Sequence, residues 1–230
     1  MRKAILIILT ALLCGCAKYE ADEFTGYTLP RITGYNTGVT NDWLYFCLED
    51  GTFMNLESPN SDLPEGFQYY NIKWDFAICG CKMRTNSGTS GRGKGGAADL
   101  GYVDYDKYQS VADLPQDLKW AVDDSTIEVT FSKNDWNRYL MANNMDFDAN
   151  PWFNPNSGPA MCKASGNPIL SQAVVYAGPP PTYEPSYHTY IIRTADGKNY
   201  YKFQVVSWFN DNTEIGGDGG MISYYLDKLK

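Results

Sequence analysis

The sequence predicts an all-β protein of packed antiparallel sheets built from hairpins, with little helix. Runs of aromatic and branched residues alternate with polar ones along most of the chain, which is the pattern of half-buried strands. Aromatic residues make up 15% of the 230 residues, with 18 Tyr, and such side chains are favoured in strands. Two Asp-Gly dipeptides, Asp50-Gly51 and Asp196-Gly197, each divide such a run and indicate hairpin turns.

The N-terminal half contains three strand patterns. Residues 42–58, DWLYFCLEDGTFMNLES, alternate on both sides of Asp50-Gly51 and predict a hairpin. Residues 67–85, FQYYNIKWDFAICGCKMRT, are so rich in aromatic and branched residues that we expect one long strand, from Tyr70 to Thr85. Residues 125–132, STIEVTFS, alternate strictly and predict a short strand.

The C-terminal third repeats this pattern after an irregular middle. Residues 186–209 predict a hairpin turning at Asp196-Gly197, and residues 219–228, GGMISYYLDK, predict a final strand. The proline-rich residues 177–186, AGPPPTYEPS, cannot lie inside a central strand. Residues 135–144 could form a short helix, and residues 146–168 are a long Asn-, Pro- and Gly-rich loop of the kind that is usually functional or disordered.

The N-terminus indicates a lipoprotein. A positive start and the apolar run Ala4–Leu13 predict a signal peptide over residues 1–15, and Gly15 before Cys16 predicts lipidation of Cys16. Residues 16–28 are then the lipidated cysteine and a flexible tether, and residues 29–230 a single β domain. We expect the protein at the outer membrane, held by its lipid anchor alone, exposed at the cell surface and also able to be released.

Charge and residue inventory exclude several functions. Without the signal peptide's Arg2 and Lys3, 17 of the 19 basic residues remain against 27 acidic ones, a net charge of −10 that argues against nucleic-acid binding. One histidine, no nucleophile elbow and no HExxH motif predict that the protein is not an enzyme. The pair Asp146 and Asp148 lies in a loop where Asp is usually a turn residue.

Four cysteines remain beyond the signal and lipidation sites: Cys47, Cys79, Cys81 and Cys162. The sequence leaves their pairing open, between buried free thiols and one disulfide. Within a single strand, Cys79 and Cys81 would share one face. A structural zinc site is not expected, because four soft ligands at the usual spacing are missing.

The glycine-rich loop of residues 84–98, RTNSGTSGRGKGGAA, resembles a phosphate-binding loop at first. Its Gly88–Lys94 fits all but the last position of G-x-x-x-x-G-K-[ST]. That motif requires Ser or Thr after the lysine and a helix that begins there, whereas Gly95 follows Lys94 and the next residues are β-like. Nucleotide binding is therefore not predicted, and the loop is interpreted as a connector between strands.

The same loop carries a resemblance to a known family. Residues 73–97, KWDFAICGCKMRTNSGTSGRGKGGA, resemble the signature of the HmuY family of Bacteroidetes haem-binding lipoproteins, in which a W-D strand runs into an R-x-N-x-G-x-S-G-x-G-K-G-G-A loop. Residues 43–56, 180–211 and 219–226 are similar to its first hairpin, its P-T-Y … R-x-A-D-G segment and its last strand. The match covers most of the mature chain and is weakest over residues 136–170.

This resemblance implies both fold and function. Members of the family are all-β and hold haem in a cleft between projecting hairpins, where two axial side chains clamp the iron. Iron with two protein ligands has no open position for oxygen chemistry, which suits capture without turnover. The protein is then expected to bind haem and to pass it to an outer-membrane uptake system, a TonB-dependent receptor.

The resemblance also implies where the iron ligands lie. The first follows the strand of residues 125–132, where no histidine is present, so Met141 or Met145 is the natural substitute. The second falls near Tyr176, with Met161 the nearest methionine before it. A thioether favours ferrous haem and a phenolate ferric haem.

Other side chains are weaker candidates for contact with haem. Trp152 and Phe153 could stack on the porphyrin. The lone histidine, His188, lies where the family has no ligand and is expected to be a surface or hydrogen-bonded residue. Each candidate methionine could equally fill the core. A glycan- or peptide-binding lipoprotein on the same scaffold is the alternative function, favoured by the aromatic, acidic composition and the missing family histidines.

Overall fold

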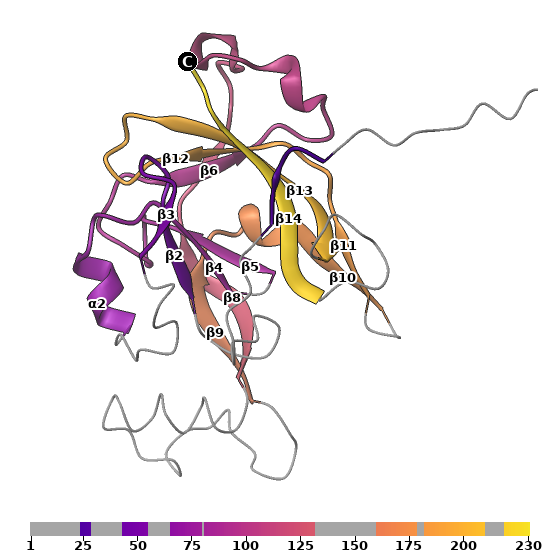
Figure 1. Cartoon of the computed structure of the whole chain (residues 1–230). Coiled ribbons are helices and arrows are strands. Elements are labelled where there is room, and N and C mark those ends of the chain that lie inside the picture. Colours follow the sequence, from indigo (N-terminus) through magenta and orange to yellow (C-terminus); the bar gives the residue numbers. More distant parts are fainter. Residues whose placement is uncertain are drawn as a thin grey trace, which may run out of the picture.

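The computed structural model describes residues 24–28, 43–54, 65–79, 81–131, 160–178, 182–209 and 219–230. Among the described residues, the strands form four antiparallel sheets, and the helices are one short α-helix, α2 (Glu65–Tyr70), and a few three-residue 3₁₀ turns. The predicted all-β class is confirmed, and Figure 1 shows the larger sheets in the body of the molecule with two hairpins extending from it.

The larger sheet has six strands in the order β1-β14-β13-β12-β6-β7. Its centre contains the hairpin predicted at Asp196-Gly197, where Gly197 adopts a φ of +78° that suits glycine. The last residues of the predicted tether, Tyr27 and Thr28, pair with β14 at one edge. The strand bounds are β1 (Tyr27–Thr28), β6 (Gly96–Asp99), β7 (Trp120–Ala121), β12 (Tyr190–Arg193), β13 (Tyr200–Phe209) and β14 (Gly219–Lys228).

The second sheet has four strands in the order β3-β2-β4-β5: β3 (Thr52–Phe53), β2 (Leu44–Cys47), β4 (Phe76–Cys79) and β5 (Lys82–Thr85). The turn predicted at Asp50-Gly51 joins β2 to β3, with Gly51 at a φ of +66°.

The prediction of one strand from Tyr70 to Thr85 is wrong. The chain ends α2 at Tyr70 and then forms β4 and β5, which fold back on each other with Cys79 opposite Lys82. Folding back places Ile78 opposite Met83, and both side chains are buried in the core, which one extended strand could not achieve. Cys81 therefore lies in the turn before β5 and does not continue the strand of Cys79.

The core fills the space between these two sheets. Phe76 of β4 and Phe203 of β13 are both buried, and their ring centroids lie 5.3 Å apart. Burial of such large apolar side chains is the main stabilising contribution to a fold of this kind. The remaining buried side chains of the cluster come from both sheets and include Leu44, Phe46, Ile78, Met83, Tyr190, Ile192, Val205, Ile222 and Tyr224.

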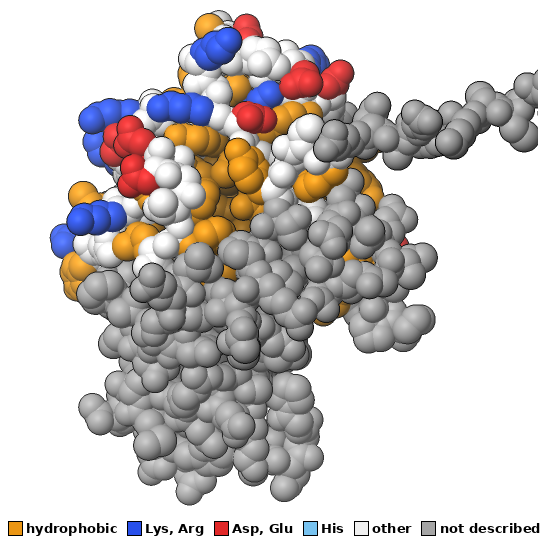
Figure 2. Space-filling view, in the orientation of Figure 1, with side chains coloured by type: hydrophobic (Ala, Val, Ile, Leu, Met, Phe, Trp, Pro, Cys, Tyr) orange, Lys and Arg blue, Asp and Glu red, His pale blue; other side chains and the backbone are white. Residues whose placement is uncertain are grey.

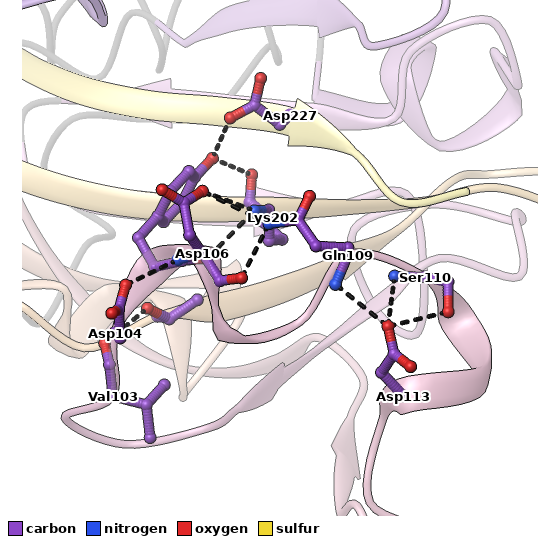
Figure 3. Close-up of polar contacts among 10 residues, drawn as sticks. Val103, Asp104, Asp106, Gln109, Ser110, Asp113, Lys202 and Asp227 are labelled. Carbon is purple, nitrogen blue, oxygen red and sulfur yellow. Dashed lines mark hydrogen bonds and ion pairs between the residues drawn. The ribbon is translucent and has the colours of Figure 1, made fainter.

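A long connection, residues 100–119, crosses from β6 to β7 and is held to the large sheet by Lys202 (Figure 3). The Lys202 side chain is only 3% exposed; its Nζ donates to the Tyr105 carbonyl at 3.0 Å and lies 3.7 Å from Asp106. The Tyr105 hydroxyl donates to Asp227 of β14 at 2.8 Å, and burial together with this bond raises the pKa of Tyr105. This buried lysine contacts Tyr105 and Asp106 and therefore holds the connection to β13.

The described surface combines an apolar area with charged side chains. Figure 2 shows apolar side chains gathered in the middle of one face, with Lys, Arg, Asp and Glu side chains around them. Among the described residues, none of the helices has the length and apolar character needed to cross a membrane. The predicted signal peptide and Cys16 lie outside the described residues.

Candidate functional site

Two hairpins extend from the body, and each forms a two-stranded sheet of its own (Figure 1). The first pairs β8 (Asp124–Phe131) with β9 (Ala160–Gly166). The second pairs β10 (Val174–Gly178) with β11 (Thr182–Pro185). In Figure 1 both point away from the C-terminal end of the chain. These hairpins carry the candidate ligand positions that the structure describes.

A short rigid segment, residues 167–173, joins the two hairpins. Its Asn167 is fully buried; the side-chain amide donates to the Ala121 carbonyl and to Asp123, and the side-chain oxygen accepts from the N–H groups of Ile169 and Leu170. The backbone N–H of Asn167 donates to the Met83 carbonyl of β5 at 2.8 Å. Both hairpins therefore start from one segment that is fixed to the core.

The base of the first hairpin is organised by Asp123, which is 2% exposed and directly precedes β8. Its carboxylate accepts from the Thr85 N–H at 2.8 Å, the Thr85 hydroxyl at 2.6 Å, the Asn167 amide at 3.0 Å and the Ser87 hydroxyl at 3.3 Å. Burial raises the pKa of Asp123 above its ordinary value, and the hydrogen bonds partly oppose that rise. Asp123 thus joins β5, the glycine loop and the linking segment.

Arg84 of β5 ties the neighbouring strands together. Its side chain is 2% exposed, donates to the Tyr45 hydroxyl at 3.0 Å and to the Ser165 carbonyl of β9 at 3.2 Å, and lies 3.6 Å from the centroid of the Trp43 ring. A guanidinium buried in this way needs several hydrogen bonds and favours contact with an aromatic face. The arginine of the R-x-N motif therefore links β2 to the first hairpin.

The second hairpin is attached to the large sheet by an aromatic stack. Tyr183 of β11 and Trp208 of β13 lie with ring centroids 4.3 Å apart and an interplanar angle of 21°. The Ser186 N–H donates to the Ala173 carbonyl at 2.9 Å and closes the base of the hairpin. The two hairpins are consequently held by different contacts, the first by polar groups and the second by stacked rings.

The glycine loop is wrapped around the buried side chain of Asn86. The Asn86 amide donates to the carbonyls of Asn71 and Trp74, and its oxygen accepts from the Gly93 N–H at 3.0 Å. Every backbone N–H from Thr89 to Gly95 donates to another protein atom, so this run offers none to a phosphate. The interpretation of the loop as a structural connector is confirmed, with Lys94 exposed to solvent.

Replacing Gly91 by Ala is expected to destabilise the protein by about 1–3 kcal/mol, because an added Cβ would lie 2.1 Å from the Asn86 side-chain oxygen. Lys94→Ala is the control in the same loop, because its side chain is exposed. Urea denaturation followed by tryptophan fluorescence measures both variants. Equal midpoints for Gly91→Ala and the unmodified chain would contradict this account of the loop.

The structure describes only part of the predicted ligand set. Met161 lies on β9 opposite Thr130 of β8, and Tyr176 lies on β10 opposite Tyr183 of β11. These two candidates are therefore on different hairpins joined by the linking segment. The other candidates, Met141, Met145, Trp152 and Phe153, and the predicted lipidation site Cys16, lie outside the described residues.

Other sequence expectations can be compared with the structure directly. His188 lies just before β12, and its Nδ1 contacts the carboxylate of Asp99, so the expectation of a hydrogen-bonded surface histidine is confirmed. Cys47 and Cys81 are free thiols, and burial raises the pKa of each. No group of three or more His, Cys, Asp or Glu within the described ranges could hold a metal ion.

Sequence reasoning did not single out Asp123 or Asn167, which organise the base of the hairpins. Each is a polar residue at the boundary of a strand, where Asp and Asn usually serve as turn residues. The only sequence feature that could have pointed to them is their position directly outside the strand patterns. Their importance depends on contacts between distant residues: Asp123 accepts from Thr85, 38 residues away, and from Asn167, 44 residues away.

Comparisons with known proteins agree with this architecture. A sequence model of the family described as HmuY protein matches residues 39–225. No curated protein matches the chain. Among solved structures, a HmuY-like heme binding protein from Bacteroides vulgatus is 14% identical with a TM-score of 0.52, and the match covers 86% of this chain and 94% of that chain.

Two further solved structures are similar. The apo HmuY analog of Tannerella forsythia is 17% identical, with a TM-score of 0.49 and coverage of 91% of this chain and 100% of that chain. Apo PinO from Porphyromonas gingivitis is 18% identical, with a TM-score of 0.49 and coverage of 83% and 93%. At such identities a structural likeness concerns the fold, and the Bacteroides vulgatus structure is the one that supports it here.

Proposed function

Because the chain belongs to the HmuY family, we propose that it binds haem between its two projecting hairpins and passes it to an outer-membrane haem uptake system. The observation that carries the proposal is the family match over residues 39–225. The hairpins agree with it, because both start from one fixed segment and so carry candidate ligand positions on two separate elements.

The iron would be held by two axial side chains, at least one of them methionine. Met141 and Met145 are the candidates that follow β8, and Tyr176 and Met161 are the candidates for the second position. Thioether and phenolate groups are both known types of haem ligand, so the chemistry of this donor set fits an iron porphyrin. Trp152 and Phe153 are the proposed contacts for the porphyrin faces.

A rigid base is what such a site requires. Two axial ligands on separate hairpins hold the iron only if the spacing of the hairpins is fixed, since a loose site loses affinity through the entropy of ordering. Asp123, Asn167 and Arg84 supply that rigidity for the first hairpin through buried hydrogen bonds. The Tyr183–Trp208 stack supplies it for the second.

The proposed role is capture and transfer without chemical turnover. Iron with two protein ligands keeps no position open for oxygen or peroxide. We further propose that Cys16 is lipidated, that the protein is anchored in the outer membrane with its β domain at the cell surface, and that a TonB-dependent receptor takes up the haem. The signal-peptide pattern and the polar residues after Cys16 support this placement.

Haemin titration of the mature chain tests the proposal. We expect a shifted and sharpened Soret band in the ferric or the dithionite-reduced state, because axial ligands from the protein replace those of free haemin. Met141→Ala and Met145→Ala identify the ligand after β8: one of the two is expected to weaken binding while the other serves as its control. No Soret change in either oxidation state would contradict haem binding.

One observation favours glycan or peptide binding as a second candidate function. Tyr70 at the end of α2 is 68% exposed, Ile72 beside it is 65% exposed, and the Arg92 guanidinium lies 5.2 Å from the Tyr70 ring centroid. Exposed aromatic faces next to a cation are suited to stacking on sugars or peptide side chains. A glycan-array signal that is lost in Tyr70→Ala but kept in Met145→Ala would favour this function.

A further inference from the structure

The lone histidine is held in a specific orientation at the surface of the large sheet. The Nδ1 atom of His188 lies 3.1 and 3.0 Å from the two carboxylate oxygens of Asp99, at the end of β6. The side chains of His188 and Asp99 are 38% and 34% exposed. The other ring nitrogen, Nε2, has no hydrogen-bond partner in the described part of the chain.

This geometry fixes the chemistry of the ring. A carboxylate accepts hydrogen bonds, so Asp99 favours the neutral tautomer that carries its proton on Nδ1. The lone pair of Nε2 is then available, and the bond to the carboxylate makes this nitrogen a better electron donor. Histidines that bind metals almost always donate their other ring N–H to a carboxylate, a backbone carbonyl or a water, and Asp99 is such a partner here.

The backbone around His188 is fixed as well, at the cost of strain. Tyr187 adopts a φ of +56°, which is unfavourable for a bulky aromatic residue. Its carbonyl accepts from the Gln204 side chain at 2.9 Å, the His188 N–H donates to the Ser186 hydroxyl at 3.2 Å, and the Thr189 N–H donates to the Gly101 carbonyl at 3.1 Å. A strained conformation held from both sides often marks a ligand contact.

The donor set selects the kind of ligand. A bare metal ion needs three or more protein donors, and the described residues contain no such group. A haem iron brings four porphyrin nitrogens and needs only one axial imidazole. Exposed aromatic residues lie close in the chain to the groups that hold His188: Tyr187 precedes it and is 37% exposed, and Tyr102 follows Gly101, which accepts from Thr189, and is 81% exposed.

We propose that His188 is the axial ligand of a second, weaker haem contact at the protein surface, with Asp99 as the residue that positions its ring. The inference rests on the proposed function, because haem is the cargo that would reach it. This contact is separate from the proposed site between the hairpins. His188 lies between the end of β11 and the start of β12, where the β10–β11 hairpin joins the body. Haem bound here by a single ligand would exchange readily.

The first experiment titrates haemin into the mature chain without a histidine tag, followed by Soret absorbance. We expect a tight phase and a weaker second phase. His188→Ala removes the second phase and leaves the first, Asp99→Asn weakens the second by about 10- to 100-fold, and Asp117→Asn, at another exposed carboxylate, changes neither. Urea midpoints of the variants check that each is folded.

Because the chain contains a single histidine, nitrogen-15 NMR of the imidazole gives a second readout. We expect the Nδ1-protonated tautomer in the free protein and a shifted Nε2 resonance with gallium protoporphyrin as the probe. A single haem phase that His188→Ala leaves unchanged, or loss of the tight phase in His188→Ala, would overturn the inference. Absence of every phase in the unmodified chain would instead contradict the proposed function.

Discussion

Replacing Asp123 by Ala is expected to lower the free energy of unfolding by about 3–5 kcal/mol, because its buried donors lose their acceptor. The Thr85 N–H and hydroxyl, the Ser87 hydroxyl and the Asn167 amide would all lose a bond in the interior. Water cannot easily replace the carboxylate, since Asp123 is only 2% exposed. Urea denaturation followed by circular dichroism measures the loss.

Asp117→Ala is the matched control for this variant, because Asp117 lies in an exposed part of the connection between β6 and β7. We expect its unfolding free energy to stay within about 0.5 kcal/mol of the unmodified chain. If Asp123→Ala lost less than about 1 kcal/mol, the hydrogen bonds at the base of the first hairpin would not be what holds it. Haem affinity is expected to fall together with the stability.

Replacing Asp75 by Asn is expected to cost about 2–4 kcal/mol, although the two side chains have nearly the same shape. One carboxylate oxygen of Asp75 accepts from the Leu48 N–H at 2.9 Å and the other from the Ala195 N–H at 2.7 Å. An amide at this position points its NH₂ group at one of those donors. The aspartate of the W-D motif therefore connects the small sheet to the turn at Asp196-Gly197.

The Asp75 variant also has an expected pH dependence. Burial raises the pKa of Asp75 in the folded protein above its value in the unfolded chain. Between these two pKa values the folded state therefore binds more protons than the unfolded state. The contribution of Asp75 to stability is then greatest below the unfolded pKa and decreases as the pH rises through the folded pKa. The advantage of the unmodified chain over Asp75→Asn should shrink over that range, and urea midpoints measured against pH would detect it. An advantage that grows over the same range would contradict this sign.

Local signals in the sequence predict most of the fold. The hairpins at Asp50-Gly51 and Asp196-Gly197 follow from turn chemistry and alternation, both of which act over a few residues. The role of the glycine loop as a connector also follows from local sequence, because Gly95 stands where a phosphate-binding loop needs Ser or Thr.

What the sequence could not predict depends on contacts between distant residues. The strand expected from Tyr70 to Thr85 is a hairpin, because folding back buries both Ile78 and Met83 against strands far along the chain. The base of the first hairpin likewise joins Thr85 to Asp123 and Asp123 to Asn167. No periodicity in the sequence reports such pairings.

The candidate site was predicted unevenly for a related reason. The family resemblance, counted back from Pro181, implies Tyr176 as the second ligand, with Met161 the nearest methionine before it, and the structure shows these two residues on β10 and β9. Met141 and Met145 lie where the resemblance to the family is weakest, and both are outside the described residues. All four residues remain predictions as iron ligands.

The absorption spectrum of the haem-loaded protein in both oxidation states tests the central claim most directly, since it reports the axial ligands of the iron. We predict a six-coordinate, low-spin spectrum in at least one state, with methionine as one ligand, and its loss in the Met141 or the Met145 variant. A spectrum identical to that of free haemin in both states would contradict the claim that the two hairpins hold haem.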